Sequence, residues 1–216
     1  MSGEKPRSGD STGTDAEDDP NGGDDPSGST DVSDSADPLA WETLSAEVAY
    51  SCPGFDVRHE EVRLPDGTGT DFDSLDEPPA VVVLPFTPDG EVVVIEEWRQ
   101  AVGRVNRGLP VGSVEPGDGS LAAAARRELS EETGYEAGSV EFLTTVEPSN
   151  GVSNALHHQF VAHDCRPAGD QALDADESIR VDTATLDALD GAIADGTLRD
   201  GRSALCVLYY ERFGDG

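Results

Sequence analysis

The segment from Arg127 to Tyr135 constrains the fold of this chain most, because it reads as the end of a well-specified helix. Asp118 or Ser120 can cap the start of that helix. The run Ala122–Ala125 favours helix formation, and Gly134 suits the left-handed conformation that ends many helices. Apolar residues recur every four positions and predict a buried stripe: Leu121, Ala125 and Leu129. The sequence therefore predicts a helix that packs one face on the core and keeps its glutamates off that face.

Three carboxylates of this segment are three and four positions apart, so they lie on one side of the predicted helix: Glu128, Glu131 and Glu132. Anionic side chains so close together repel one another unless a cation lies between them. Mg²⁺ prefers oxygen ligands and usually bridges to the phosphates of a substrate. The alternative is a solvated charged face on which Arg127 and Glu131 form an ordinary i,i+4 ion pair.

The loop before the helix, residues 109–118, is rich in glycine and proline and favours the cation site. Loop and helix together resemble the Nudix box, in which a glycine loop precedes an arginine–glutamate–apolar–any–glutamate–glutamate helix, with Gly112 as the leading glycine. One position departs from the family spacing. Asp118 precedes Arg127 by one residue too many, and Gly119 stands at the strict position of the first acid. We interpret this as a one-residue insertion in the loop, which leaves the role of that first acid open.

Short apolar runs separated by turn signals predict strands mixed with a few helices. A helix or turn is expected around residues 41–46, followed by strand-like sequence over 50–64 and a turn at 65–67. Further strands are expected at 80–86, 92–95, 140–146, 156–162 and 179–181, the first two joined as a hairpin by the turn 87–90. Helical periodicity covers 185–195 and 203–213. This order predicts an α/β fold with a sheet covered by helices.

From about residue 41 to the end, the order of motifs is similar to the ADP-ribose pyrophosphatase branch of the Nudix hydrolases. Besides the box, the matching pieces are Pro65–Gly67, Val81–Gly90, Glu97–Arg99, Gly108–Gly112, Ser149–Ala155, Phe160–Ala162, Asp176–Ile179 and Gly191–Asp195. The resemblance implies a Nudix-type mixed β-sheet sandwiched between α-helices over residues 41–216. Two positions differ: Gly108 and Ala155 stand where the branch has glutamates, and the second of those positions or activates water in the branch.

The resemblance also implies roles for residues of this chain. Metal ligands would be the carbonyl of Gly112 and the carboxylates of Glu128, Glu131 and Glu132, with Mg²⁺ as the ion and Mn²⁺ as the alternative. Glu128, Glu131 and Arg127 would be catalytic, with Arg127 orienting the glutamates and a box glutamate such as Glu128 assisting the activation of water. Substrate would contact Arg99, Trp98 and Gly112.

Each role has a plainer alternative. Arg127 can be a surface ion pair and Arg99 a strand-end arginine, although a guanidinium forks onto two phosphate oxygens as lysine cannot. Trp98 can stack on adenine or pack in the core. His157 and His158 follow the altered loop, and alternation along a strand puts one on each face. One of them can replace the missing carboxylate as a base, or both can be ordinary strand histidines.

The net charge of −31, with 45 acidic residues and a single lysine, limits the partners of the chain. Such acidity opposes binding to nucleic acid and to anionic membrane surfaces. An acidic interaction protein and an adaptation to molar salt both explain it. The acids spread over the whole length, which resembles halophilic archaeal proteins. The three cysteines have no CxxC spacing, no apolar run approaches the length of a membrane span, and no signal-peptide pattern begins the chain, so a reducing cytoplasm is expected.

Residues 1–40 contain no aromatic residue and predict a disordered acidic tail, with a docking segment as the alternative. For the rest of the chain, three functions remain open. The first is a metal-dependent pyrophosphatase of ADP-ribose or a related nucleotide sugar, giving AMP and a sugar phosphate. The second is a Nudix pyrophosphohydrolase of nucleoside triphosphates or dinucleoside polyphosphates. The third is a non-catalytic nucleotide-sugar sensor. Branch members are often homodimers, so the resemblance implies a homodimer.

Overall fold

The computed structural model describes residues 37–175 and 177–214, so most of the predicted tail lies outside the described residues. The last residues of the predicted tail, 37–40, form a turn in which the amide of Leu39 donates a hydrogen bond to the side chain of Asp37. The first elements form an antiparallel three-stranded sheet of β1 (Glu42–Cys52), β2 (Phe55–Arg63) and β3 (Gly69–Asp76) in that order. The helix or turn expected at 41–46 was wrong, because residues 42–46 belong to a strand that pairs with β2.

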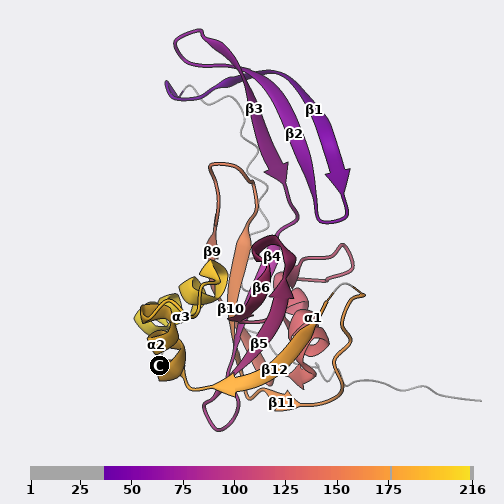
Figure 1. Cartoon of the computed structure of the whole chain (residues 1–216), viewed down its shortest axis with the longest axis vertical. Coiled ribbons are helices and arrows are strands. Elements are labelled where there is room, and N and C mark those ends of the chain that lie inside the picture. Colours follow the sequence, from indigo (N-terminus) through magenta and orange to yellow (C-terminus); the bar gives the residue numbers. More distant parts are fainter. Residues whose placement is uncertain (1–36, 176, 215–216) are drawn as a thin grey trace, which may run out of the picture. The chain divides into compact units, whose positions relative to one another are not determined.

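Two further sheets form the centre of the fold (Figure 1). A mixed sheet has the order β7 (Val111–Ser113), β4 (Ala80–Pro85), β10 (His157–His163) and β9 (Ser139–Val146), with β4 and β10 parallel. An antiparallel sheet has the order β12 (Ile179–Ala184), β5 (Val92–Arg99) and β6 (Arg104–Gly108). The short strands β8 (Tyr135–Glu136) and β11 (Arg166–Pro167) pair with each other.

The predicted hairpin over residues 80–95 is corrected by this arrangement. The turn at 88–90 is present, but it joins strands of two different sheets, and Phe86 and Val92 share only an isolated bridge. Both strands are apolar throughout, so each can be buried in its own sheet and the sequence alone does not assign their partners. The expected loop before the box also contains a strand, β7.

Helices lie against the central sheets, as Figure 1 shows: α1 (Leu121–Thr133), α2 (Leu186–Ala194) and α3 (Gly201–Phe213). A short 3₁₀ turn, η1 (Gln100–Val102), follows β5. Alternate residues of β4 divide between two apolar clusters, as expected for successive side chains of a strand. Val81 and Val83 pack with Ala125 and Leu129 of α1, whereas Val82 and Leu84 pack with the cluster of α2 and α3. The predicted α/β fold, with a mixed sheet between helices, is confirmed.

The box helix α1 begins and ends as its sequence predicts. Ser120 is the N-cap, and its side chain accepts a hydrogen bond from the amide of Ala123 at 3.1 Å. Gly134 ends the helix with φ +72°, and a Cβ there would lie 2.4 Å from the carbonyl oxygen of Gly169. Only glycine therefore fits this turn without strain.

Among the described residues, no helix is long and apolar enough to span a membrane.

Candidate active site

One cavity of about 380 Å³ gathers the predicted glutamates with charged residues from distant parts of the chain. We call the contribution of residues 111–132 the box side: it includes Gly112, Glu128, Glu131 and Glu132. We call the remaining lining from other segments the assembled side: it includes Glu77, Arg99, Ala155, His157, Asp174, Glu177 and Arg202. The chain thus places acidic, cationic and imidazole groups around a single cavity.

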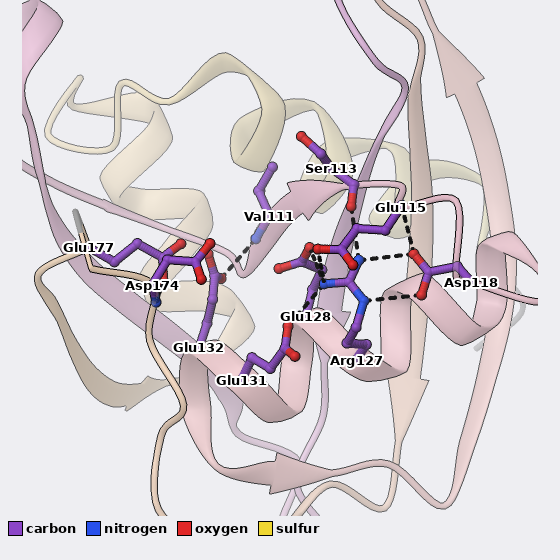
Figure 2. Close-up of polar contacts among 10 residues, drawn as sticks. All are labelled: Val111, Ser113, Glu115, Asp118, Arg127, Glu128, Glu131, Glu132, Asp174 and Glu177. Carbon is purple, nitrogen blue, oxygen red and sulfur yellow. Dashed lines mark hydrogen bonds and ion pairs between the residues drawn. The ribbon is translucent and has the colours of Figure 1, made fainter. Parts of the chain in front are cut away.

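Arg127 organises the carboxylates of the box side (Figure 2). Its Nη1 donates to Glu128 Oε1 at 2.8 Å and to Glu131 Oε2 at 2.9 Å. Its Nη2 also donates to the carbonyl of Ser113 at 2.9 Å, which ties α1 to β7. The surrounding carboxylates raise the pKa of Arg127, with Asp118 as the largest cause, so the guanidinium is permanently charged. Arg127 therefore fixes the positions of two predicted metal ligands.

The one-residue insertion leaves Asp118 in contact with the box. Asp118 accepts from Arg127 Nε at 3.0 Å and from Nη2 at 2.9 Å, which is the bidentate geometry that makes arginine–carboxylate pairs strong. This hydrogen bonding lowers the pKa of Asp118. The displaced first acid thus holds Arg127, and the structure gives it a supporting position that the sequence left open.

Gly112 allows the close approach of Glu128 to β7. A Cβ built on Gly112 would lie 2.0 Å from the carboxyl carbon of Glu128 and 2.1 Å from both carboxyl oxygens. The backbone of β7 and the side chain of α1 therefore occupy the space that any other residue would need. Burial raises the pKa of Glu128, and the neighbouring Arg127 opposes that rise. A glycine at this position lets the carboxylate lie directly against the strand.

Glu132 is the most deeply buried carboxylate of the box side. Its Oε2 accepts from the amide of Val111 at 3.0 Å, the contact drawn in Figure 2. The pKa of Glu132 is raised to about 8, mainly by burial; the negative charges of Glu128 and Glu177 contribute to this rise, and the hydrogen bond from Val111 opposes it. Buried carboxylates that repel one another in this way are stabilised by a bound cation.

The donor set fits a hard divalent cation. The side chains offer carboxylate oxygens, the ligands that Mg²⁺ and Mn²⁺ take, and the raised pKa values of Glu128 and Glu132 mark negative charge without full compensation. As they stand, no three His, Cys, Asp or Glu side chains within residues 37–175 and 177–214 are grouped closely enough to hold an ion. Arg127 instead takes the oxygens of Glu128 and Glu131, so a cation would compete with this arginine for them.

Arg99 lines the cavity, whereas Trp98 does not. Arg99 Nη2 lies 2.7 Å from Oε2 of the buried Glu97, an ion pair without hydrogen-bond geometry. Burial raises the pKa of Glu97, and Arg99 is the main opposing cause. Trp98 is 48% exposed, and its indole N–H donates to Gln100 at 2.9 Å. Successive side chains of a strand point to opposite faces, so Trp98 faces away from the side of β5 that carries its neighbours Glu97 and Arg99. Within one chain, Trp98 therefore packs neither in the core nor against the cavity.

Ala155 of the altered loop and His157 after it both lie at the cavity, and a contact with α3 accounts for the departure at Gly108. Ala155 is buried, and both residues line the cavity. His158 points elsewhere, with Nδ1 2.8 Å from the hydroxyl of Thr145. A Cβ at Gly108 would lie 2.7 Å from Ser203 Oγ, which accepts from the amide of Leu109. The contact with α3 therefore leaves no room for a glutamate at Gly108.

Sequence reasoning missed four charged residues of the assembled side. Asp174 and Glu177 lie beside Glu132 in Figure 2, and the Asp174 amide donates to Glu177 Oε2 at 2.9 Å. Glu77 accepts a hydrogen bond from Ser153, and Arg202 Nε donates to Asp200 at 3.0 Å. These acids and this arginine of the assembled side stand apart in the sequence, so no spacing pattern around them indicates a site. The match around residues 176–179 was noted, but it assigned no role to Glu177.

Comparison with known proteins agrees with this geometry. The NUDIX domain matches residues 76–202, more than half of the chain. ADP-ribose pyrophosphatase of Bacillus subtilis (strain 168) is 28% identical over 174 residues, covering 80% of this chain and 94% of the relative. Methanol dehydrogenase activator of Bacillus methanolicus is 28% identical over 171 residues, covering 79% and 92%. A crystal structure titled as ADP compounds hydrolase matches with a TM-score of 0.71 at 21% identity, covering 80% and 93% of the two chains. The chain therefore belongs to the Nudix hydrolase family.

Proposed function

We propose that this chain hydrolyses the diphosphate bond of ADP-ribose or a related nucleoside diphosphate sugar in a Mg²⁺-dependent reaction, giving AMP and a sugar phosphate. The observation that carries the proposal is the single cavity in which the box carboxylates and Arg99 meet. A diphosphate presents crowded negative oxygens, which need both a cation and hydrogen-bond donors. The similarity to ADP-ribose pyrophosphatase of Bacillus subtilis favours this substrate class.

Different residues of the chain would bind the cation and the substrate. When bound at the carboxylates, Mg²⁺ or Mn²⁺ neutralises phosphate oxygens and lowers the pKa of a coordinated water. Glu128, Glu131, Glu132 and the carbonyl of Gly112 would hold the ion, and Arg127 orients the first two carboxylates through its hydrogen bonds. Arg99 forks onto the phosphate oxygens, while buried Glu97 holds that guanidinium near the cavity.

A second candidate keeps the same box and changes the substrate. RNA pyrophosphohydrolase of Caulobacter vibrioides is 44% identical over 78 residues, so a pyrophosphohydrolase of nucleoside triphosphates or dinucleoside polyphosphates remains the alternative. Ala155 places no carboxylate in the altered loop, and it is the observation that favours a nucleotide-sugar sensor. The complete set of box carboxylates favours an enzyme over that sensor.

A substrate panel tests the proposal. Full-length protein in molar KCl, with Mg²⁺ or Mn²⁺, is offered ADP-ribose, other nucleoside diphosphate sugars, nucleoside triphosphates and dinucleoside polyphosphates, and the products are identified. We expect AMP and ribose 5-phosphate from ADP-ribose, with no turnover in EDTA. Hydrolysis of triphosphates alone would move the chain to the second candidate. Binding of ADP-ribose without cleavage of any diphosphate would establish the sensor.

Three further properties belong to this proposal. The acidic composition would adapt a cytoplasmic protein to concentrated salt, because molar salt shortens the Debye length to about 3 Å and screens self-repulsion. A melting temperature independent of KCl would contradict that.

The chain would pair with a second copy through the β1–β3 sheet, where Leu44, Val48 and Tyr50 of β1 are exposed. Sedimentation as a monomer at micromolar concentration would contradict the homodimer.

A further inference from the structure

His157 lies where two cavities meet. The active-site cavity of about 380 Å³ adjoins a second cavity of about 510 Å³ through shared lining residues: Glu77, Ala155, His157 and Arg202. His157 is the first residue of β10 and pairs in register with Ala80 of β4. Ala155, two residues earlier, lines both cavities together with His157. A titratable ring thus stands at the position in the cavity where the altered loop has lost a carboxylate.

The surroundings of His157 keep its imidazole neutral. Its Nδ1 is buried and has no hydrogen-bond partner among the described residues. Burial lowers the pKa of His157, and Arg202, at the start of α3, lowers it further. Glu77 and Asp200 oppose this, and His158 on the same strand adds to it. A neutral imidazole with a free nitrogen lone pair is the form that accepts a proton.

Several carboxylates of the site already have other partners. Glu128 is bonded to Arg127 and lies against Gly112, and Glu132 accepts from the amide of Val111. Glu77 accepts from Ser153, and Glu177 accepts from the amide of Asp174. The box glutamates are also the predicted ligands of the cation, which further occupies their lone pairs. His157 lies outside the predicted ligand set and, unlike these carboxylates, has a ring nitrogen without a hydrogen-bond partner among the described residues.

We propose that His157 is the general base of the hydrolysis, in place of the carboxylate absent at Ala155; this inference rests on the proposed function. The water oxygen forms a bond to phosphorus while its proton moves to a nitrogen of His157. The bridging P–O bond breaks, and its electron pair leaves with the departing phosphate oxygen. The imidazolium then returns the proton to the product phosphate or to solvent, which restores the neutral ring.

The experiment compares wild type, His157→Asn and the matched control His163→Asn, which lies at the other end of β10, stacked on Phe86 and lining a separate cavity of about 170 Å³. With ADP-ribose and Mg²⁺, His157→Asn should lower kcat by about 100-fold with little change in KM, since a positioned base contributes about 10² to 10⁴-fold. Wild-type kcat should fall as the pH drops through the pKa of His157, and this acidic limb should vanish in His157→Asn. His163→Asn should keep both.

Four measurements separate a base from a structural residue. The affinity for Mn²⁺, followed by electron paramagnetic resonance, and the melting temperature should be the same in His157→Asn as in wild type. One imidazole NMR signal of the wild type should be absent from His157→Asn, which assigns that signal to His157. In wild type, the titration midpoint of this signal should equal the midpoint of the acidic limb of the kcat profile. Adding Ala155→Glu to His157→Asn should restore part of kcat, because a carboxylate then returns to the same cavity.

The outcomes are distinguishable. An acidic limb that survives in His157→Asn, or an undiminished kcat, assigns the proton to another group such as Asp174 and overturns this inference while the proposed function stands. A wild-type profile without an acidic limb also overturns it. A wild type that cleaves no nucleoside diphosphate sugar refutes the proposed function itself. A His157→Asn variant that unfolds is replaced by His157→Gln, for which the same kcat loss and pH change are required.

Discussion

The two sides of the active-site cavity are built in different ways. The box side comes from one stretch, residues 111–132, whose strand β7 and helix α1 are tied by the hydrogen bond from the Val111 amide to Glu132 and by Arg127. The assembled side comes from separate segments: the loop before β4, the end of β5, the loop before β12, the start of β10 and the start of α3. One side is fixed by local contacts, whereas the other depends on the whole fold.

This difference separates two tasks. The box side carries carboxylates with uncompensated charge, which suits a cation and therefore any diphosphate. The assembled side places Arg99, His157 and Arg202 around the same cavity, where Arg99 is proposed to bind the phosphate oxygens and His157 to act as the base. Substitutions on the box side should therefore lower turnover of every substrate alike, and substitutions on the assembled side should alter its pH dependence or selectivity.

The largest effect is expected from Glu131→Gln or Glu132→Gln. Each change removes a ligand charge while keeping the shape of the side chain, so kcat should fall by at least ~100-fold, about 2.7 kcal/mol of barrier. The fall should be the same for ADP-ribose and for any other diphosphate that the wild type cleaves. Circular dichroism should show an intact fold. Glu141→Gln, on the exposed part of β9 outside this cavity, is the control. Turnover within a factor of a few of wild type would remove these glutamates from the site.

A smaller effect is expected from Gly112→Ala. The added Cβ would meet the Glu128 carboxyl group at 2.0 Å, so this carboxylate must move away from β7. We expect kcat to fall by about tenfold or more, ~1.4 kcal/mol, together with a weaker affinity for Mn²⁺. Gly117→Ala is the matched control in the same loop, since nothing lies within 4 Å of a Cβ there. Equal activity of the two variants would show that the contact between Gly112 and Glu128 does not position the ligand.

The box side could be predicted from sequence because its information is local. Helix periodicity, the Ser120 cap and Gly134 define α1, and the i,i+3 and i,i+4 spacing brings the glutamates together. The insertion before Arg127 hid the role of Asp118, because spacing alone cannot show that a longer loop still reaches the guanidinium. The bidentate contact was visible only in the structure.

The assembled side was less predictable because tertiary contacts create it. Arg202 and Glu77 lie far apart in the chain, and no sequence spacing links them to the box. Strand pairing had the same limit: residues 42–46 belong to β1 and pair with β2, and the runs 80–86 and 92–95 lie in different sheets. Trp98 was predicted in the site, but β5 turns it away from the cavity that holds Arg99. Its role in substrate binding stays a prediction.

The smallest effect concerns the stability of the metal-free chain. The folded-state pKa of Glu132 is raised from 4.5 to about 8, chiefly by burial. A carboxyl group with a raised pKa binds its proton more tightly in the folded state, so its contribution to stability is complete below the unfolded pKa and is lost as the pH rises through the folded pKa. Between pH 5 and 8, the melting temperature in EDTA and constant KCl should therefore fall more in wild type than in Glu132→Gln.

The expected difference is a few degrees, since ~1 kcal/mol corresponds to about 2–4 °C in a chain of this size. Mg²⁺ should reduce the fall in wild type, because a cation stabilises the ionised carboxylate that high pH produces. The residual slope of Glu132→Gln reports the other buried acids, Glu128 and Glu97, whose pKa values are raised in the same direction. Parallel slopes in wild type and Glu132→Gln would show that Glu132 is not held protonated by burial. The box side would then need no cation to offset that charge, and its contrast with the assembled side would be weaker.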